Sequence, residues 1–245
     1  MKYLLIAGFL ACTGLTFAQR KIEQTVPVRS GQTIQMSFDD PELIKVHTWD
    51  KNEVLVRGEV SINRGENDDA FEIVVENTSD AVSISSRLRD RDKIPGRTLI
   101  RKGDQEYYFP TNDPKDPSIM KFLEENGGSY TYMSNGIIRD INLEVWVPQG
   151  VTTSIKAKYG LVEITNFNAP LQVDAKYGGV DATVVASKTG DLTARTKYGE
   201  ILTNLDVKFT PVDEQKNWTE IKTTLGNGPA YVLESHYGKV YLRKP

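Results

Sequence analysis

Apolar and polar residues alternate along most of the first third of the chain. Residues 33–38 and 54–62 show the alternation, and the turn-forming run Asp39-Asp40-Pro41 ends the first of them. Successive side chains of a β-strand point to opposite faces, so a period of two predicts strands with one buried face. Short strands at regular intervals, without a helical period, predict an all-β region over residues 19–88.

The alternation stops between residues 89 and 140. This segment contains four prolines and is rich in aromatic residues. Pro117 and Ser118, followed by an apolar run that ends at Asn126-Gly127, predict one short helix with Ser118 as its N-cap. A segment of this length without regular strands is often functional or disordered. Its aromatic side chains either cover an open edge of the sheet or bind a partner. The second interpretation makes candidate binding residues of Tyr107, Tyr108, Tyr130 and Tyr132.

A ten-residue phrase recurs through residues 141–245 and organises this half of the chain. Each copy places a Tyr-Gly pair between two short alternating segments. The clear copies are marked by Tyr159, Tyr177, Tyr198 and Tyr237, and a degenerate copy is marked by Leu225. A glycine after each marker is typical of a corner at which φ is positive or two backbones approach closely. The markers are 18, 21, 27 and 12 residues apart, and spacings near 20 residues indicate coils of a β-solenoid.

The repeats predict a single-stranded parallel β-helix (a β-solenoid) in the C-terminal half, continuous with the β-rich N-terminal region and interrupted by the helix-containing insertion. Equivalent residues of successive coils would then stack about 4.8 Å apart. Tyr159, Tyr177 and Tyr198 would form a ladder, with Tyr237 further along, and stacking explains why tyrosine recurs. A β-sandwich or meander with Tyr-Gly at hairpin turns is the alternative, although two-residue hairpins favour Asn-Gly or Asp-Gly.

Lysine directly precedes tyrosine in three of the copies. Lys158, Lys176 and Lys197 would align on the outer face of the β-helix. Two ammonium groups about 5 Å apart in water repel each other by only about 0.8 kcal/mol, so a solvated face tolerates them. The row is therefore either a solvent-exposed ladder or a binding site for an anionic partner such as a surface glycan.

Residues 1–18 have the features of a secretory signal peptide. Lys2 precedes an apolar run, and cleavage is expected between Ala18 and Gln19. The run is shorter than the roughly 20 residues of a membrane-spanning helix. Cys12 is the only cysteine and fits a lipidation site poorly, so the mature chain is expected to lack disulfides and thiol chemistry. We therefore expect export across the inner membrane to the periplasm, the cell surface or the medium, with no transmembrane segment in the mature chain.

Composition and motifs narrow the functional classes. The net charge is −3 and the pI about 5.6, so no basic field indicates a nucleic-acid partner. The two histidines, His47 and His236, lack metal-ligand spacing, and the sequence has neither a nucleophile elbow nor a phosphate-binding loop. No catalytic residue, metal or cofactor is therefore predicted, and the chain is not expected to be an enzyme.

The Lys-Tyr-Gly repeats, together with the alternating N-terminal region and the signal peptide, resemble the bacterial exported "putative adhesin" domains of unknown function. The resemblance covers residues 26–88 and 141–242 and implies a β-helix and adhesion at a surface, without active-site residues. We expect a non-enzymatic envelope or cell-surface protein that binds a glycan, protein or matrix partner. The alternative is a carbohydrate lyase or hydrolase on the same scaffold. Its candidate residues are Glu163, Asp181, Lys158 and Lys176.

Overall fold

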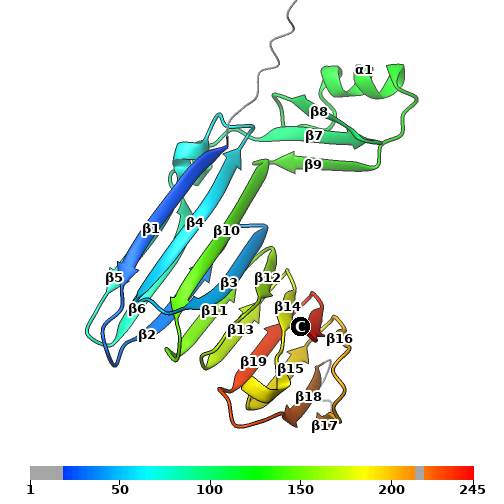
Figure 1. Cartoon of the computed structure of the whole chain (residues 1–245). Helices are drawn as coiled ribbons and strands as arrows, with labels where there is room; N and C mark the ends of the chain where they lie inside the picture. Colours follow the sequence, from blue (N-terminus) through cyan, green and yellow to red (C-terminus); the bar gives the residue numbers. More distant parts are fainter. Residues whose placement is uncertain (1–18, 213–217) are drawn as a thin grey trace, which may run out of the picture.

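The computed structural model describes residues 19–212 and 218–245, which consist mainly of β-structure. Two large sheets, here called A and B, face each other, and a small third sheet, C, extends from one end together with an α-helix (Figure 1). The all-β part of the prediction is confirmed. The predicted signal peptide, with Cys12 and the cleavage site after Ala18, lies outside the described residues.

Sheet A has eight strands and changes its pairing direction part-way across. Its order is β1 (Arg20–Pro27), β4 (Glu53–Ile62), β10 (Arg139–Pro148), β3 (Leu43–Trp49), β12 (Leu161–Ile164), β14 (Val180–Thr183), β20 (Val240–Arg243) and β16 (Ile201–Thr203). The strands β1, β4 and β10 pair antiparallel. Every pair from β10 to β16 is parallel.

Sheet B has nine strands, with antiparallel pairs at both ends and parallel pairs between them. Its order is β17 (Thr210–Val212), β18 (Thr219–Thr224), β15 (Asp191–Thr196), β19 (Tyr231–Ser235), β13 (Leu171–Ala175), β11 (Thr153–Ala157), β2 (Thr33–Phe38), β6 (Ala81–Leu88) and β5 (Phe71–Asn77). The pairs β17–β18, β18–β15 and β6–β5 are antiparallel. The remaining pairs are parallel.

Sheet C is antiparallel and accompanies the helix of the insertion. Its order is β8 (Gln105–Phe109), β7 (Arg97–Lys102) and β9 (Tyr132–Gly136), and the helix α1 spans Pro117–Glu125. The helix lies where the sequence predicts one, but its N-cap is Asp116, whose side chain accepts a hydrogen bond of 2.9 Å from the Ser118 backbone N–H. Short 3-10 helices occur at Asp68–Ala70, Arg91–Lys93 and Ala186–Lys188. None of the described helices has the length and apolar character that crossing a membrane requires.

The two large sheets enclose one hydrophobic core. Alternate residues are buried along the strands, as at Ile34, Met36 and Phe38 of β2, and buried residues of both sheets belong to the same cluster. The period-two pattern therefore identifies the buried face. Full burial of each large apolar side chain contributes about 1.5–3 kcal/mol. The N-terminal region and the repeats share both sheets, because β12 pairs with β3 and β11 pairs with β2.

Each Tyr-Gly pair lies where the chain turns from a strand of sheet B towards a strand of sheet A. Tyr159-Gly160, for example, connects β11 to β12. Glycine is required because the backbones of neighbouring copies approach closely there. A Cβ on Gly178 would collide with the carbonyl oxygen of Gly160, and a Cβ on Gly238 would collide with that of Gly178. The pairs are therefore corners between the sheets and not hairpin turns.

The prediction of a single-stranded parallel β-helix is wrong. Both large sheets contain antiparallel pairs, and the degenerate copy, which lies in β18, pairs antiparallel with β15. The clear copies pair in parallel and in register, but their order is β11, β13, β19 and β15, so the last copy lies between the second and the third. Parallel and antiparallel neighbours bury the same alternate residues. For this reason the pattern along the chain determines neither the direction nor the order of the strands.

Candidate functional site

The clear copies of the repeat place four tyrosines in one exposed row, here called the tyrosine ladder. Its order is Tyr159, Tyr177, Tyr237 and Tyr198, and the centroids of successive rings lie 5.3, 5.3 and 5.1 Å apart. Adjacent ring planes differ by 18° to 22°, so the rings are stacked. The structure thus stacks the tyrosines that the sequence predicts to stack, but Tyr237 lies between Tyr177 and Tyr198 rather than beyond them.

Backbone hydrogen bonds hold the corners of the ladder in register. The Tyr177 N–H donates to Lys158 O at 2.9 Å, and the Tyr237 N–H donates to Lys176 O at 3.0 Å. Each stacked aromatic pair contributes about 0.5–1.5 kcal/mol of stability beyond what the burial of its apolar area contributes. The four rings are 37% to 52% exposed. Stacking covers the faces of the rings, so their edges and hydroxyl groups form the exposed part.

A row of basic side chains, here called the basic row, borders the ladder. It consists of Lys158, Lys176, His236 and Lys197, each of which directly precedes a tyrosine of the ladder. Each lysine Nζ lies 5.1 to 5.4 Å from the centroid of the tyrosine ring that follows it, which is a cation–π distance. The three predicted lysines therefore share one row, although His236 separates Lys176 from Lys197. Lys158 approaches Asp39 at 4.0 Å, whereas Lys176 and Lys197 form no ion pair within the described part of the chain.

His236 connects the basic row to an acidic pair. Its Nε2 lies 3.0 Å from Glu234 Oε1 and 3.4 Å from Asp174 Oδ1. The buried Glu234 also accepts a hydrogen bond of 2.5 Å from Arg195 Nε. The possible ligand atoms of Asp174, Glu234 and His236 lie within 4.8 Å of one another. Arg195 already supplies positive charge to Glu234, so we interpret the group as an ion-pair network. Sequence spacing did not reveal it because three copies of the repeat contribute to it.

Arg139 joins the ladder to the insertion. Its guanidinium carbon lies 5.6 Å from the ring centroid of Tyr159, and one of its nitrogens forms an ion pair with the buried carboxylate of Asp40. Asp40 also pairs with Arg91 at 2.8 Å. A charge this deeply buried is stable only when it is paired and hydrogen-bonded. Asp40 therefore holds Arg139 at the end of the ladder.

A polar cleft of about 550 Å³ lies beside Arg139, lined by residues of sheet C and by the ends of β4 and β10. Tyr132 lines the cleft, and the guanidinium carbon of Arg101 lies 5.8 Å from its ring centroid. Desolvation raises the pKa of Glu42 in the cleft, and repulsion by Asp140 raises it further. Arg139 therefore lies both in the lining of the cleft and at the end of the ladder.

The other aromatic candidates of the insertion divide into packed and exposed residues. Tyr107 packs against Phe122 of α1, with ring centroids 4.4 Å apart. Burial raises the pKa of the Tyr108 hydroxyl. Tyr130 and Tyr132 are each 48% exposed. Tyr107 and Tyr108 therefore stabilise the insertion, and Tyr130 and Tyr132 are the accessible pair.

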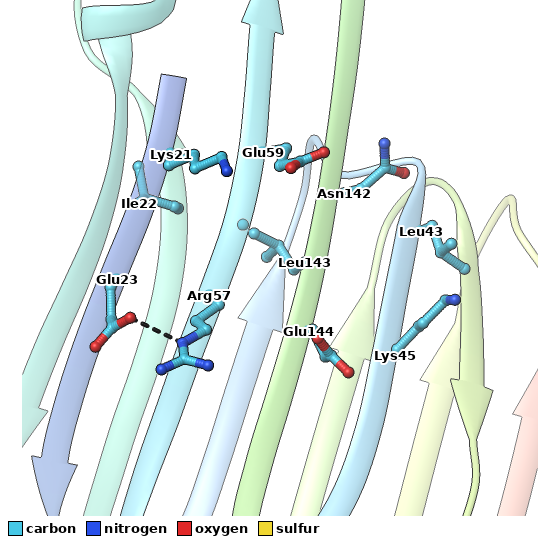
Figure 2. Close-up of a pocket in the computed structure, with 11 residues that line it drawn as sticks. Lys21, Ile22, Glu23, Leu43, Lys45, Arg57, Glu59, Asn142, Leu143 and Glu144 are labelled. Carbon is cyan, nitrogen blue, oxygen red and sulfur yellow. Dashed lines mark hydrogen bonds and ion pairs between the residues drawn. The ribbon is translucent and has the colours of Figure 1, made fainter. Parts of the chain in front are cut away.

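A second concavity, here called the sheet A groove, lies across β1, β4, β10 and β3 (Figure 2). Its volume is about 710 Å³. Arg57 and Glu23 form an ion pair of 2.8 Å within it. The groove is lined by Lys21, Ile22, Glu23, Leu43, Lys45, Arg57, Gly58, Glu59, Asn142, Leu143 and Glu144. These residues come from four strands that are not consecutive along the chain, so no local sequence motif indicates the groove.

Tryptophans continue the outer face of sheet A next to the groove. Trp146 occupies the next outward position of β10 after Glu144. Its ring centroid lies 6.2 Å from that of Trp49 and 5.8 Å from that of His47. The guanidinium carbon of Arg57 lies 5.7 Å from the same ring. Arg57 therefore connects the charged lining of the groove to an aromatic cluster.

The residues suggested for the alternative enzymatic function lie on sheet A and at the corners between the sheets. Glu163 and Asp181 are paired neighbours on sheet A, where Arg243 donates hydrogen bonds of 2.7 and 2.8 Å to Asp181. Lys158 and Lys176 lie at the corners, each close to the ring of its own tyrosine. The two carboxylates are therefore neighbours on sheet A, whereas the two lysines belong to the corners.

No protein-family model and no curated protein sequence matches the chain. Among solved structures, it is similar to a "putative cell adhesion protein" from Clostridium sporogenes, with 9% identity and a TM-score of 0.48, over 93% of this chain and 100% of that one. It is also similar to a "putative adhesin" from Bacteroides fragilis, with 10% identity and a TM-score of 0.28, over 95% of this chain and 100% of that one. Likenesses this remote carry no argument about the ligand, so the function is inferred from the residues of this chain.

Proposed function

We propose that the chain is a non-enzymatic, adhesin-like binding protein that holds an anionic glycan along the tyrosine ladder and the basic row. The observation that supports this proposal is the alignment of two rows at the same corner, one of exposed phenol rings and one of basic side chains. A polymer with negative charges at regular intervals can contact both rows at each step.

The basic row supplies the charge for such a ligand. Lys176 and Lys197 form no ion pair with another described residue, so their ammonium groups can pair with a carboxylate or sulfate group of the ligand. One exposed ion pair contributes only about 0–1 kcal/mol. Several such pairs made with one polymer raise its affinity through multivalency. Because the pairs are exposed, salt is expected to weaken the binding.

The tyrosine ladder supplies hydrogen bonds and apolar contact. Phenol hydroxyl groups both donate and accept hydrogen bonds. The backbone holds the rings at a spacing of 5.1 to 5.3 Å, so little conformational entropy is lost when a ligand contacts them. A preorganised row of this kind suits a repetitive ligand.

The proposed location is outside the inner membrane. The positively charged start, the apolar run and the small residue Ala18 at its end support export through a signal peptide. A protein in the periplasm or at the cell surface meets envelope and matrix polysaccharides, which include the class of ligand that the two rows would bind.

The test measures binding of the purified chain to immobilised heparin, a sulfated glycan, by surface plasmon resonance. The variant Lys176→Gln/Lys197→Gln is expected to bind at least about tenfold more weakly. Its affinity is also expected to depend less on salt. The control variant Lys115→Gln/Lys121→Gln removes the same charge from exposed positions at and just before α1, and it is expected to bind like the wild type.

Two results would contradict the proposed site. If the wild type does not bind heparin, or if both double variants lose the same affinity, the ladder does not select the ligand. The same incubations are then assayed for new reducing ends. Depolymerised heparin would show that the chain is an enzyme.

A further inference from the structure

We infer that the sheet A groove is a second binding site and that its ligand is a neutral glycan, held through its pyranose rings. This site goes beyond the proposed function, because it differs from the ladder in position and in charge. The groove crosses four strands of sheet A (Figure 2), whereas the ladder follows the corners between the two large sheets.

The charges of the groove are balanced. Three cationic side chains and three carboxylates line it, namely Lys21, Lys45, Arg57, Glu23, Glu59 and Glu144. A site without net charge attracts neither a polyanion nor a polycation over long range. A neutral ligand also brings no charge that must be removed from water. The balance therefore favours a polar ligand without charge.

The polar groups of the groove can still form hydrogen bonds. Lys45 and Glu59 form no ion pair within residues 19–212 and 218–245. The Asn142 side-chain nitrogen donates to Asp140 at 2.8 Å, which leaves its carbonyl oxygen as an acceptor. Sugar hydroxyl groups donate and accept, so they can use an ammonium group, a carboxylate and an amide oxygen together.

Apolar surface accompanies these polar groups. Leu43 lines the groove with a partly exposed side chain, whereas Leu143 lies at its floor, is 2% exposed and belongs to the core. Trp146 lies at the next outward position after Glu144 on the same strand. The apolar face of a pyranose ring packs against surfaces of this kind. Apolar and aromatic residues with a few placed polar groups are also the usual lining of small-ligand sites.

The size of the groove suits a short oligosaccharide. Its volume of about 710 Å³ lies within the roughly 300–1,000 Å³ of small-ligand sites. Four strands at a spacing of about 4.8 Å span roughly 14 Å. Several linked rings are needed to cross that distance, so the ligand is expected to be an oligosaccharide and not a single sugar.

The test titrates the purified chain with four neutral hexasaccharides, cellohexaose, maltohexaose, chitohexaose and mannohexaose, by isothermal titration calorimetry. The titrations are made in about 1 M salt, where the Debye length falls to roughly 3 Å and exposed ion pairs are screened. At least one hexasaccharide is expected to bind. The charge-conserving variant Lys45→Ala/Glu59→Ala is expected to weaken that binding at least about tenfold.

The control is Lys121→Ala/Glu125→Ala on α1, which also conserves charge and removes a pair 3.8 Å apart on the helix surface. It is expected to bind the hexasaccharide like the wild type. Asn142→Ala provides a second groove variant with the same expected loss, and circular dichroism checks that each variant is folded.

Three outcomes would overturn the inference: no neutral hexasaccharide binds, the two folded groove variants bind like the wild type, or Lys176→Gln/Lys197→Gln removes the neutral binding. Heparin binding by Lys45→Ala/Glu59→Ala is expected to equal that of the wild type. The groove and the ladder are therefore tested separately, and either can fail without the other.

Discussion

Replacing Gly178 by alanine tests how closely neighbouring copies of the repeat approach each other. The new Cβ would lie inside the van der Waals contact distance of the Gly160 carbonyl group, and a backbone group cannot rotate away as a side chain does. Gly178 does not have a positive φ, so the substitution introduces no left-handed strain. The expected loss of stability is therefore steric.

The magnitude follows from the contacts that must open to admit the methyl group. The Tyr177 N–H donates to Lys158 O at 2.9 Å, and the Val162 N–H donates to Gly179 O at 3.0 Å. Each hydrogen bond contributes about 0.5–1.5 kcal/mol. The stack of Tyr177 on Tyr159 contributes about 0.5–1.5 kcal/mol more. Loss of these contacts predicts a decrease of about 1.5–4.5 kcal/mol in the free energy of unfolding.

Urea unfolding of the purified chain measures this decrease, and Gly150→Ala provides the control. Gly150 has a φ of 75° and no heavy atom within 4 Å of an added Cβ, so its substitution introduces left-handed strain without a collision. That strain costs about 1–2 kcal/mol. If Gly178→Ala loses no more stability than Gly150→Ala, the copies are not packed backbone to backbone at the glycine and the reasoning is refuted.

Two further predictions concern a buried hydroxyl group and a carboxyl group. Tyr231 is 2% exposed, and its hydroxyl donates to Phe167 O at 2.6 Å. Tyr231→Phe leaves that carbonyl without this donor and is expected to lower the free energy of unfolding in urea by about 1–3 kcal/mol. An unchanged urea midpoint would contradict this prediction. The pKa of Glu42 is raised above its ordinary value of 4.5, so the ionised form destabilises the folded state once the pH exceeds that value. Glu42→Gln is therefore expected to raise the melting temperature at about pH 7. This advantage is expected to shrink as the pH falls towards 4.5 and to disappear below it; an advantage that grows on acidification would show the opposite sign.

Much of the architecture could be predicted from the sequence because it follows from short-range rules. Ile155, Val173 and Leu233 occupy equivalent positions of the phrase, and all three are buried. The period of two determines which residues face the core, and glycine marks each corner because only a residue without Cβ fits there. The residue before each ladder tyrosine lies in the basic row, so three of its four members, Lys158, Lys176 and Lys197, were predicted from the sequence.

The order of the strands and the composition of the two candidate sites were decided only by the tertiary structure. Leu233 pairs with Val173 on one side and with Ala194 on the other, and the phrase is too similar among its copies to specify this order. As a consequence of this strand order, His236 lies in the basic row and in the network with Asp174. The sheet A groove depends on the adjacency of β1, β4, β10 and β3. Such long-range pairing is governed by the closure of the intervening loops and by the simultaneous burial of both inner faces, which no local pattern encodes.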